Sequence, residues 1–85
     1  MDLDTFVDQL RSILTADIPK PANPYDSLYD DLSFDSFQAF ELLIVVESLA
    51  GNVVPPEEIP ELYTLADAYE YYQSLRAAEA ETLDR

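Results

Sequence analysis

The sequence predicts an all-α protein, a small four-helix bundle with three main helices and one short helix. Three observations predict it. Apolar residues recur at helical spacing in three separate stretches, as expected when each helix buries one face. Prolines, or the chain's one glycine, mark the segments between those stretches. Finally, 48% of the 85 residues are apolar, so one domain, residues 1–85, can form a core without metal or disulfides.

The first main helix is expected over residues 2–15, where Asp2 or Asp4 can serve as the N-cap. Its apolar residues follow the i, i+3, i+4 and i+7 spacing of one helix face. They are Leu3, Phe6, Val7, Leu10, Ile13 and Leu14. The other face is polar, so the stretch predicts an amphipathic helix with one side in the core.

The segment 16–35 is expected to be a loop. Proline lacks the N–H group that a helix interior requires, and this segment contains three prolines. They are Pro19, Pro21 and Pro24. A loop of this length is uncommon in a compact domain unless it packs against the core or has a function. Leu28 and Leu32 are therefore expected to anchor it in the core.

The bounds of the second main helix, residues 36–50, follow from signals at both ends. Asp35 is a good N-cap, because its carboxylate can accept hydrogen bonds from the free N–H groups of the first turn. Gln38 follows three residues later, as in a capping box. At the other end, Gly51 can adopt the left-handed conformation that often terminates a helix.

This helix has more apolar residues than one buried face needs. Six form a complete face: Ala39, Leu42, Leu43, Val46, Leu49 and Ala50. Those that lie partly or wholly off it are Phe37, Phe40, Ile44 and Val45. Two interpretations remain open: a central helix buried on two sides, or an exposed apolar patch for a partner. Glu41 and Glu47 flank the same side of the helix.

The short third helix is expected over residues 57–62, where a proline limits it to one or two turns. The last main helix is expected over 65–77. Thr64 and Asp67 can open it through a variant of the capping box. Residues 78–85 lose the apolar periodicity and are expected to fray.

The composition excludes several classes of function. A formal net charge of −14 repels nucleic acid and anionic lipid, and it favours basic partner surfaces. Without cysteine or histidine, a Cys₂His₂ zinc site, a Ser-His-Asp triad and a cysteine nucleophile are excluded. No metal site and no catalytic machinery are expected. No secretion signal or membrane-spanning apolar run is found, so the expected location is the cytosol.

Ser36 is the candidate functional residue. If Asp35 caps the helix, the Ser36 hydroxyl points outward beside the positive end of the helix dipole. A phosphate ester would be stabilised there. The alternative is that Ser36 is an ordinary polar residue at the start of a helix.

From about Asp31 to Leu75 the chain resembles the acyl carrier proteins. The residues that carry the resemblance are Asp35-Ser36-Phe37, Glu41-Leu42-Leu43, Glu47, Val54-Pro55, Glu57-Glu58, Leu65, Ala68 and Tyr71. In that family the serine of this motif carries a covalent 4′-phosphopantetheine arm derived from coenzyme A. The resemblance implies that Ser36, next to Asp35, is the attachment site, and that the chain carries acyl or aminoacyl thioesters and is not an enzyme.

The chain is also similar to D-alanyl carrier proteins. Its divergent loop and short third helix differ from the housekeeping fatty-acid carriers and favour a discrete carrier of polyketide or other natural-product biosynthesis. The implied partners are a phosphopantetheinyl transferase, and an acyltransferase, ketosynthase or adenylating enzyme with a basic docking surface.

The docking face expected for these partners has an apolar centre and an acidic rim. Its residues are Phe37, Phe40, Glu41, Ile44 and Glu47. The chain is expected to act as a monomer, without a nucleic acid or membrane partner. The alternative function is an unmodified acidic helical interaction module that uses the same patch without a cofactor.

Overall fold

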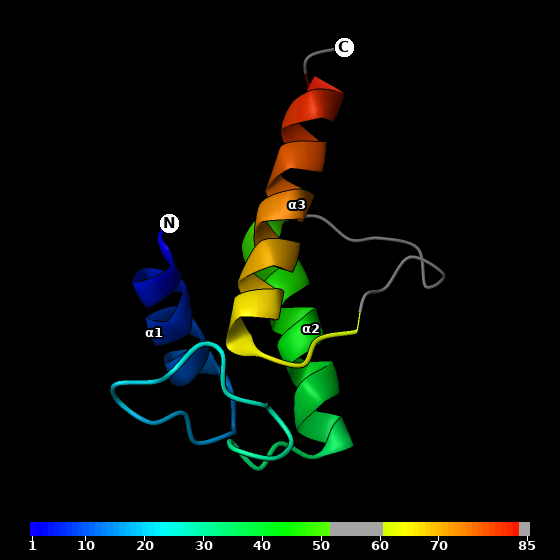
Figure 1. Cartoon of the computed structure of the whole chain (residues 1–85). Coiled ribbons are helices and arrows are strands. Elements are labelled where there is room, and N and C mark those ends of the chain that lie inside the picture. The colour runs from blue at the N-terminus through cyan, green and yellow to red at the C-terminus, as the bar shows by residue number, and fades with distance from the viewer. Residues whose placement is uncertain (52–60, 84–85) are drawn as a thin grey trace.

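The computed structural model describes residues 1–51 and 61–83. Within these ranges the chain forms three helices and no strand. They are α1 (Leu3–Ile13), α2 (Ser36–Ala50) and α3 (Leu65–Leu83). α2 and α3 make the most extensive contact, and α1 packs against both (Figure 1). The all-α prediction is confirmed.

The predicted short helix over 57–62 is not confirmed. Residues 57–60 lie outside the described ranges, and Glu61 and Leu62 are not helical. The segment before α3 is bonded to the long loop instead, since the N–H of Leu28 donates to the carbonyl of Tyr63 (2.8 Å).

α1 begins one residue later and ends two residues earlier than the predicted 2–15. Asp2 is the N-cap, and its carboxylate accepts from the N–H of Thr5 (2.9 Å). This hydrogen bond lowers the pKa of Asp2. At the other end the backbone of Leu14 is extended (ψ 150°). From this residue on, alternate side chains are buried in the core: Leu14, Ala16 and Ile18. Leu14 is buried although it lies outside the helix, so the apolar spacing of the sequence predicted a helix that is too long.

The loop is anchored in the core and tied to the start of α3. Leu28 is fully buried and Leu32 is half-buried, so both predicted anchors pack against the core. Near the middle of the loop, the carbonyl of Pro24 accepts from the N–H of Ala66 in the first turn of α3 (2.9 Å). These contacts place the loop beneath the helices, where it leads into α2 (Figure 1).

α2 spans the range expected from the sequence. Both halves of the capping box are present: the N–H of Gln38 donates to Asp35 Oδ1 (2.8 Å), and the N–H of Asp35 donates to Gln38 Oε1 (3.1 Å). Gly51 ends the helix with φ 72°, a conformation that a side chain would make costly. Ser36 is thereby fixed as the first helical residue.

α3 continues to Leu83, six residues beyond the predicted end at residue 77. The fraying expected over 78–85 stays a prediction. Residues 84 and 85 lie outside the described ranges. The start agrees with the sequence, since Asp67 N–H donates to Thr64 Oγ1 (3.0 Å). The final part of α3 is rich in alanine and glutamate, whose high helix propensity favours a helix even where the sequence has no apolar periodicity.

The core forms where the helices and the loop meet. Its largest fully buried side chains are Phe6, Leu10, Leu28, Leu42, Val46, Leu65 and Leu75. Phe6 of α1 packs against two tyrosines of α3, with ring centroids 5.2 Å from Tyr69 and 5.3 Å from Tyr72. None of the described helices is long and apolar enough to span a membrane.

Candidate functional site

Ser36 is exposed at the first position of α2. Asp35 and Gln38 complete the cap between them, and within the described residues the Ser36 hydroxyl has no hydrogen bond of its own. The first turn of α2 contains no acidic side chain. The hydroxyl is therefore accessible beside the positive end of the helix dipole, where a phosphate ester would be stabilised.

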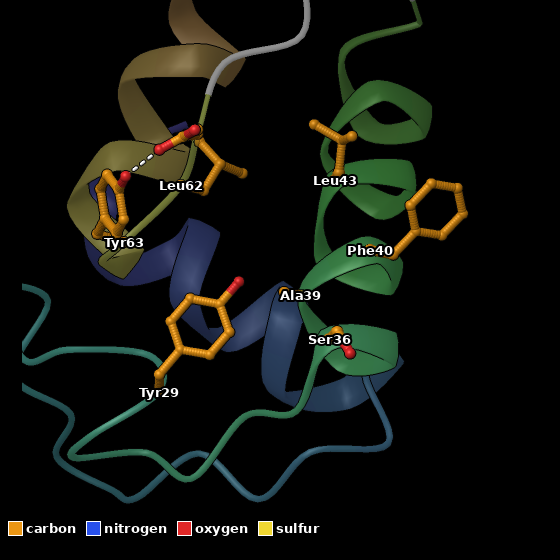
Figure 2. Close-up of a pocket in the computed structure, with 8 residues that line it drawn as sticks. Tyr29, Ser36, Ala39, Phe40, Leu43, Leu62 and Tyr63 are labelled. Carbon is orange, nitrogen blue, oxygen red and sulfur yellow. Dashed lines mark hydrogen bonds between the residues drawn. The ribbon is translucent and has the colours of Figure 1, made fainter.

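A groove opens directly at Ser36. It has a volume of about 370 Å³, within the usual range for small-molecule sites. We call it the Ser36 groove. It is lined by Tyr29, Ser36, Ala39, Phe40, Leu43, Glu61, Leu62 and Tyr63. Figure 2 shows α2 on one side and the segment 61–63 on the other, with Tyr29 of the loop between them. A group attached to Ser36 would have this groove beside it.

The outer side of α2 carries the exposed apolar patch that the sequence left open. Phe37, Phe40 and Ile44 are 71%, 58% and 48% exposed. We call these three residues the α2 patch. The opposite side of the helix faces the core, with Leu42, Leu43, Val46 and Ala50 buried. The interpretation of α2 as a helix buried on two sides is therefore wrong. A shallow hollow of about 270 Å³ lies on the patch, with Glu41 and Val45 at its edge.

The two predicted rim carboxylates are both held by neighbouring elements. Glu41 Oε1 accepts from the N–H (3.1 Å) and the hydroxyl (3.0 Å) of Thr15, just after α1. Glu47 Oε2 accepts from the hydroxyl of Tyr71 in α3 (3.3 Å). Both glutamates are half-buried. Sequence reasoning missed Thr15 and Tyr71 as partners, because they are 26 and 24 residues away along the chain.

No protein-family profile and no solved structure matches this chain. It is 31% identical over 75 residues to acyl carrier protein 2 of Ralstonia nicotianae, an alignment that covers 85% of this chain and 93% of that protein. The chain belongs to the acyl carrier protein family. Two more acyl carrier proteins support this: that of Rhodococcus erythropolis is 33% identical over 86% of the chain, and that of Acidothermus cellulolyticus is 30% identical over 81%.

Acyl carrier proteins have a carrier role and are not themselves enzymes, and membership implies a phosphopantetheine group in general. The residues of this acyl carrier protein fit such a group. The fit rests on the accessible Ser36 hydroxyl, on the positive end of α2 that would face the phosphate, and on the adjoining groove.

The Tyr71–Glu47 contact gives this acyl carrier protein a testable pH dependence. Burial, followed by the charge and the hydrogen bond of Glu47, raises the pKa of Tyr71 from 10.0 to about 12. Above pH 10 the unfolded chain therefore loses the proton before the native state does. The stabilisation is complete below pH 10 and is lost as the pH rises toward 12.

We expect the urea midpoint of the wild type to fall more steeply between pH 10 and 12 than that of Tyr71→Phe. The variant keeps the ring and removes the ionisable group, and Tyr63, whose pKa Glu61 also raises, is present in both proteins. Parallel curves would contradict the assignment.

Proposed function

We propose that this acyl carrier protein holds acyl or aminoacyl intermediates as thioesters on a 4′-phosphopantetheine arm at Ser36 and presents them to partner enzymes. The observation that carries the proposal is the Ser36 hydroxyl, which is exposed and free of hydrogen bonds within the described residues. Because Asp35 and Gln38 cap the helix, Ser36 can be modified without loss of the cap.

In the proposed modification the Ser36 oxygen forms a bond to the phosphorus next to the pantetheine half of coenzyme A. The bond from that phosphorus to adenosine 3′,5′-bisphosphate breaks, and the transferase accepts the hydroxyl proton. When bound, the arm supplies the thiol for thioester formation. The chain's own contribution is to expose the hydroxyl, to stabilise the phosphate at the start of α2 and to offer a surface for partners.

The proposed setting is polyketide or other natural-product biosynthesis in the cytosol. It rests on the sequence of the long loop over 16–35, which diverges from that of the housekeeping fatty-acid carriers. The proposed partners beyond the transferase are an acyltransferase, a ketosynthase or an adenylating enzyme.

The direct test is to incubate the protein with coenzyme A and a promiscuous phosphopantetheinyl transferase and to measure its intact mass. We expect one phosphopantetheine per chain. A protein that stays unmodified would contradict the carrier mechanism, and it would favour the alternative of an unmodified acidic interaction module.

For partner docking we propose the α2 patch, with Glu41 and Glu47 as its rim. An apolar centre with acidic edges fits a shallow partner pocket edged by arginine or lysine. The apolar side chains supply most of the affinity, while the carboxylates mainly raise the association rate and fix the orientation. Thr15 and Tyr71 hold the rim carboxylates in place.

We expect Ile44→Ala to lower kcat/KM of phosphopantetheine transfer by about tenfold, because loss of one central apolar contact costs more than 1 kcal/mol. The matched control is Ile13→Ala in α1, since Ile13 is 47% exposed and Ile44 is 48% exposed. The melting temperatures of both variants should stay close to that of the wild type. Equal loss of turnover in the two variants would move the docking face away from α2.

A further inference from the structure

The Ser36 groove is lined by apolar side chains and by one negatively charged side chain. Ala39, Leu43 and Leu62 form the apolar part. Glu61 is the one charged side chain among the described residues that line it. An acyl chain at Ser36 would therefore have a carboxylate beside it as well as apolar surface.

Tyrosines border the same space. The Tyr63 hydroxyl donates a hydrogen bond to Glu61 Oε2. Figure 2 shows Tyr63 across the groove from Leu43, with Tyr29 extending from the loop below. The hydrogen bond and the charge of Glu61 raise the pKa of Tyr63, so Tyr63 remains a neutral donor at physiological pH. The Glu61 carboxylate is thus held at the hydroxyl edge of the Tyr63 ring, in a groove that Tyr29 also lines. A carboxylate and aromatic ring faces in one groove attract cations.

The basic side chains of the described residues lie elsewhere. Arg11 and Lys20 line a different cavity, between α1 and the loop. Arg11 is occupied there, since it donates to the carbonyls of Ile18 (3.2 Å) and Pro19 (2.8 Å). A cargo that ends in a carboxylate would meet no counter-charge in the groove and would be repelled by a chain of net charge −14.

We propose that the Ser36 groove selects a positively charged cargo, an aminoacyl group whose ammonium lies between the Glu61 carboxylate and the rings of Tyr29 and Tyr63. This inference rests on the proposed attachment at Ser36. The tether keeps the cargo near the groove at high effective concentration, so weak contacts are enough to hold it. Because Tyr29 and Tyr63 are 46% and 54% exposed, the individual contacts are modest and sensitive to salt.

Three cargoes of the same backbone test the inference: β-alanyl, butanoyl and succinyl groups, which end in an ammonium, a methyl and a carboxylate. A promiscuous phosphopantetheinyl transferase loads each from its coenzyme A thioester, and intact mass reports the loading. Hydroxylamine then cleaves the thioester to a hydroxamate and the free thiol. The cleavage rate measures how well the carrier shields each cargo.

Each rate is compared between the wild type and Glu61→Gln, so that the intrinsic reactivity of each thioester cancels. We expect the β-alanyl thioester to be cleaved about two- to fivefold more slowly on the wild type than on Glu61→Gln, because the variant loses one exposed ion pair and keeps both tyrosine rings. Butanoyl and succinyl thioesters should show no such slowing. The control Asp17→Asn makes the same charge change at an exposed position after α1, outside the groove, and it should behave as the wild type.

A second measurement needs no variant: raised salt should speed cleavage of the β-alanyl cargo on the wild type and leave the butanoyl cargo unchanged. If none of the three groups is loaded onto the protein, the proposed carrier function is overturned, and this inference with it. Normal loading with equal shielding of the three cargoes, or equal β-alanyl rates on the wild type and Glu61→Gln, would overturn the inference alone.

Discussion

Ser36→Ala is expected to abolish phosphopantetheine transfer completely and to leave the helical fold intact. The loss is complete because no other atom of the side chain can form the phosphate ester. The fold should persist because the capping box is made by Asp35 and Gln38, while the Ser36 hydroxyl makes no hydrogen bond within the described residues. Alanine is also the best helix former at an exposed position. Intact mass and circular dichroism of the same sample measure both outcomes.

Two other serines provide the control for this prediction. Ser48 is exposed near the end of α2, and Ser33 is exposed in the loop with φ 59°. Ser48→Ala and Ser33→Ala should accept the arm as the wild type does. Modification that persists in Ser36→Ala would move the site to one of them. Loss of helix in Ser36→Ala would instead show that Ser36 contributes to the cap.

α2 and the position of the candidate site at its start were the features most predictable from the sequence, because the signals are local. An N-cap, a reciprocal glutamine three residues later and a terminal glycine each act within one turn. The α2 patch was visible as a surplus of apolar residues over one face, although the sequence alone left open whether the surplus was buried. Exposure of Phe37, Phe40 and Ile44 answers that question.

The ends of α1 and α3 were less predictable for opposite physical reasons. Leu14 continues the apolar spacing of α1, but its backbone is extended and its side chain is buried from there. The sequence pattern therefore indicated burial correctly and helical structure wrongly. The last residues of α3 show no apolar periodicity in the sequence, but their high helix propensity favours continuation of the helix. Apolar periodicity indicates which side chains are buried. It predicts the end of a helix only where the helix and its row of buried side chains end at the same residue.

Contacts between elements were beyond sequence reasoning. The bonds from Thr15 to Glu41 and from Tyr71 to Glu47 join residues distant along the chain. They change how the rim should be tested. A substitution such as Glu47→Lys would remove a hydrogen bond between helices as well as reverse a charge, so its effect on docking would be mixed with an effect on stability. Tyr71→Phe and Thr15→Val each remove one hydroxyl hydrogen bond to a rim carboxylate without changing its charge, and in Thr15→Val the backbone N–H of residue 15 can still donate to Glu41.

Phe6→Ala is expected to destabilise the protein by about 3–5 kcal/mol, the cost of emptying a large buried aromatic site. Phe6 is fully buried, and its ring packs against Tyr69 and Tyr72, so it joins α1 to α3. Small domains have about 5–15 kcal/mol of stability in total, so this variant should be close to unfolding. The matched control is Phe37→Ala: Phe37 is 71% exposed, and an exposed substitution of this kind changes stability by about 0.5 kcal/mol or less. Urea unfolding followed by circular dichroism compares the two. Similar midpoints for Phe6→Ala and Phe37→Ala would contradict the packing of α1 against α3.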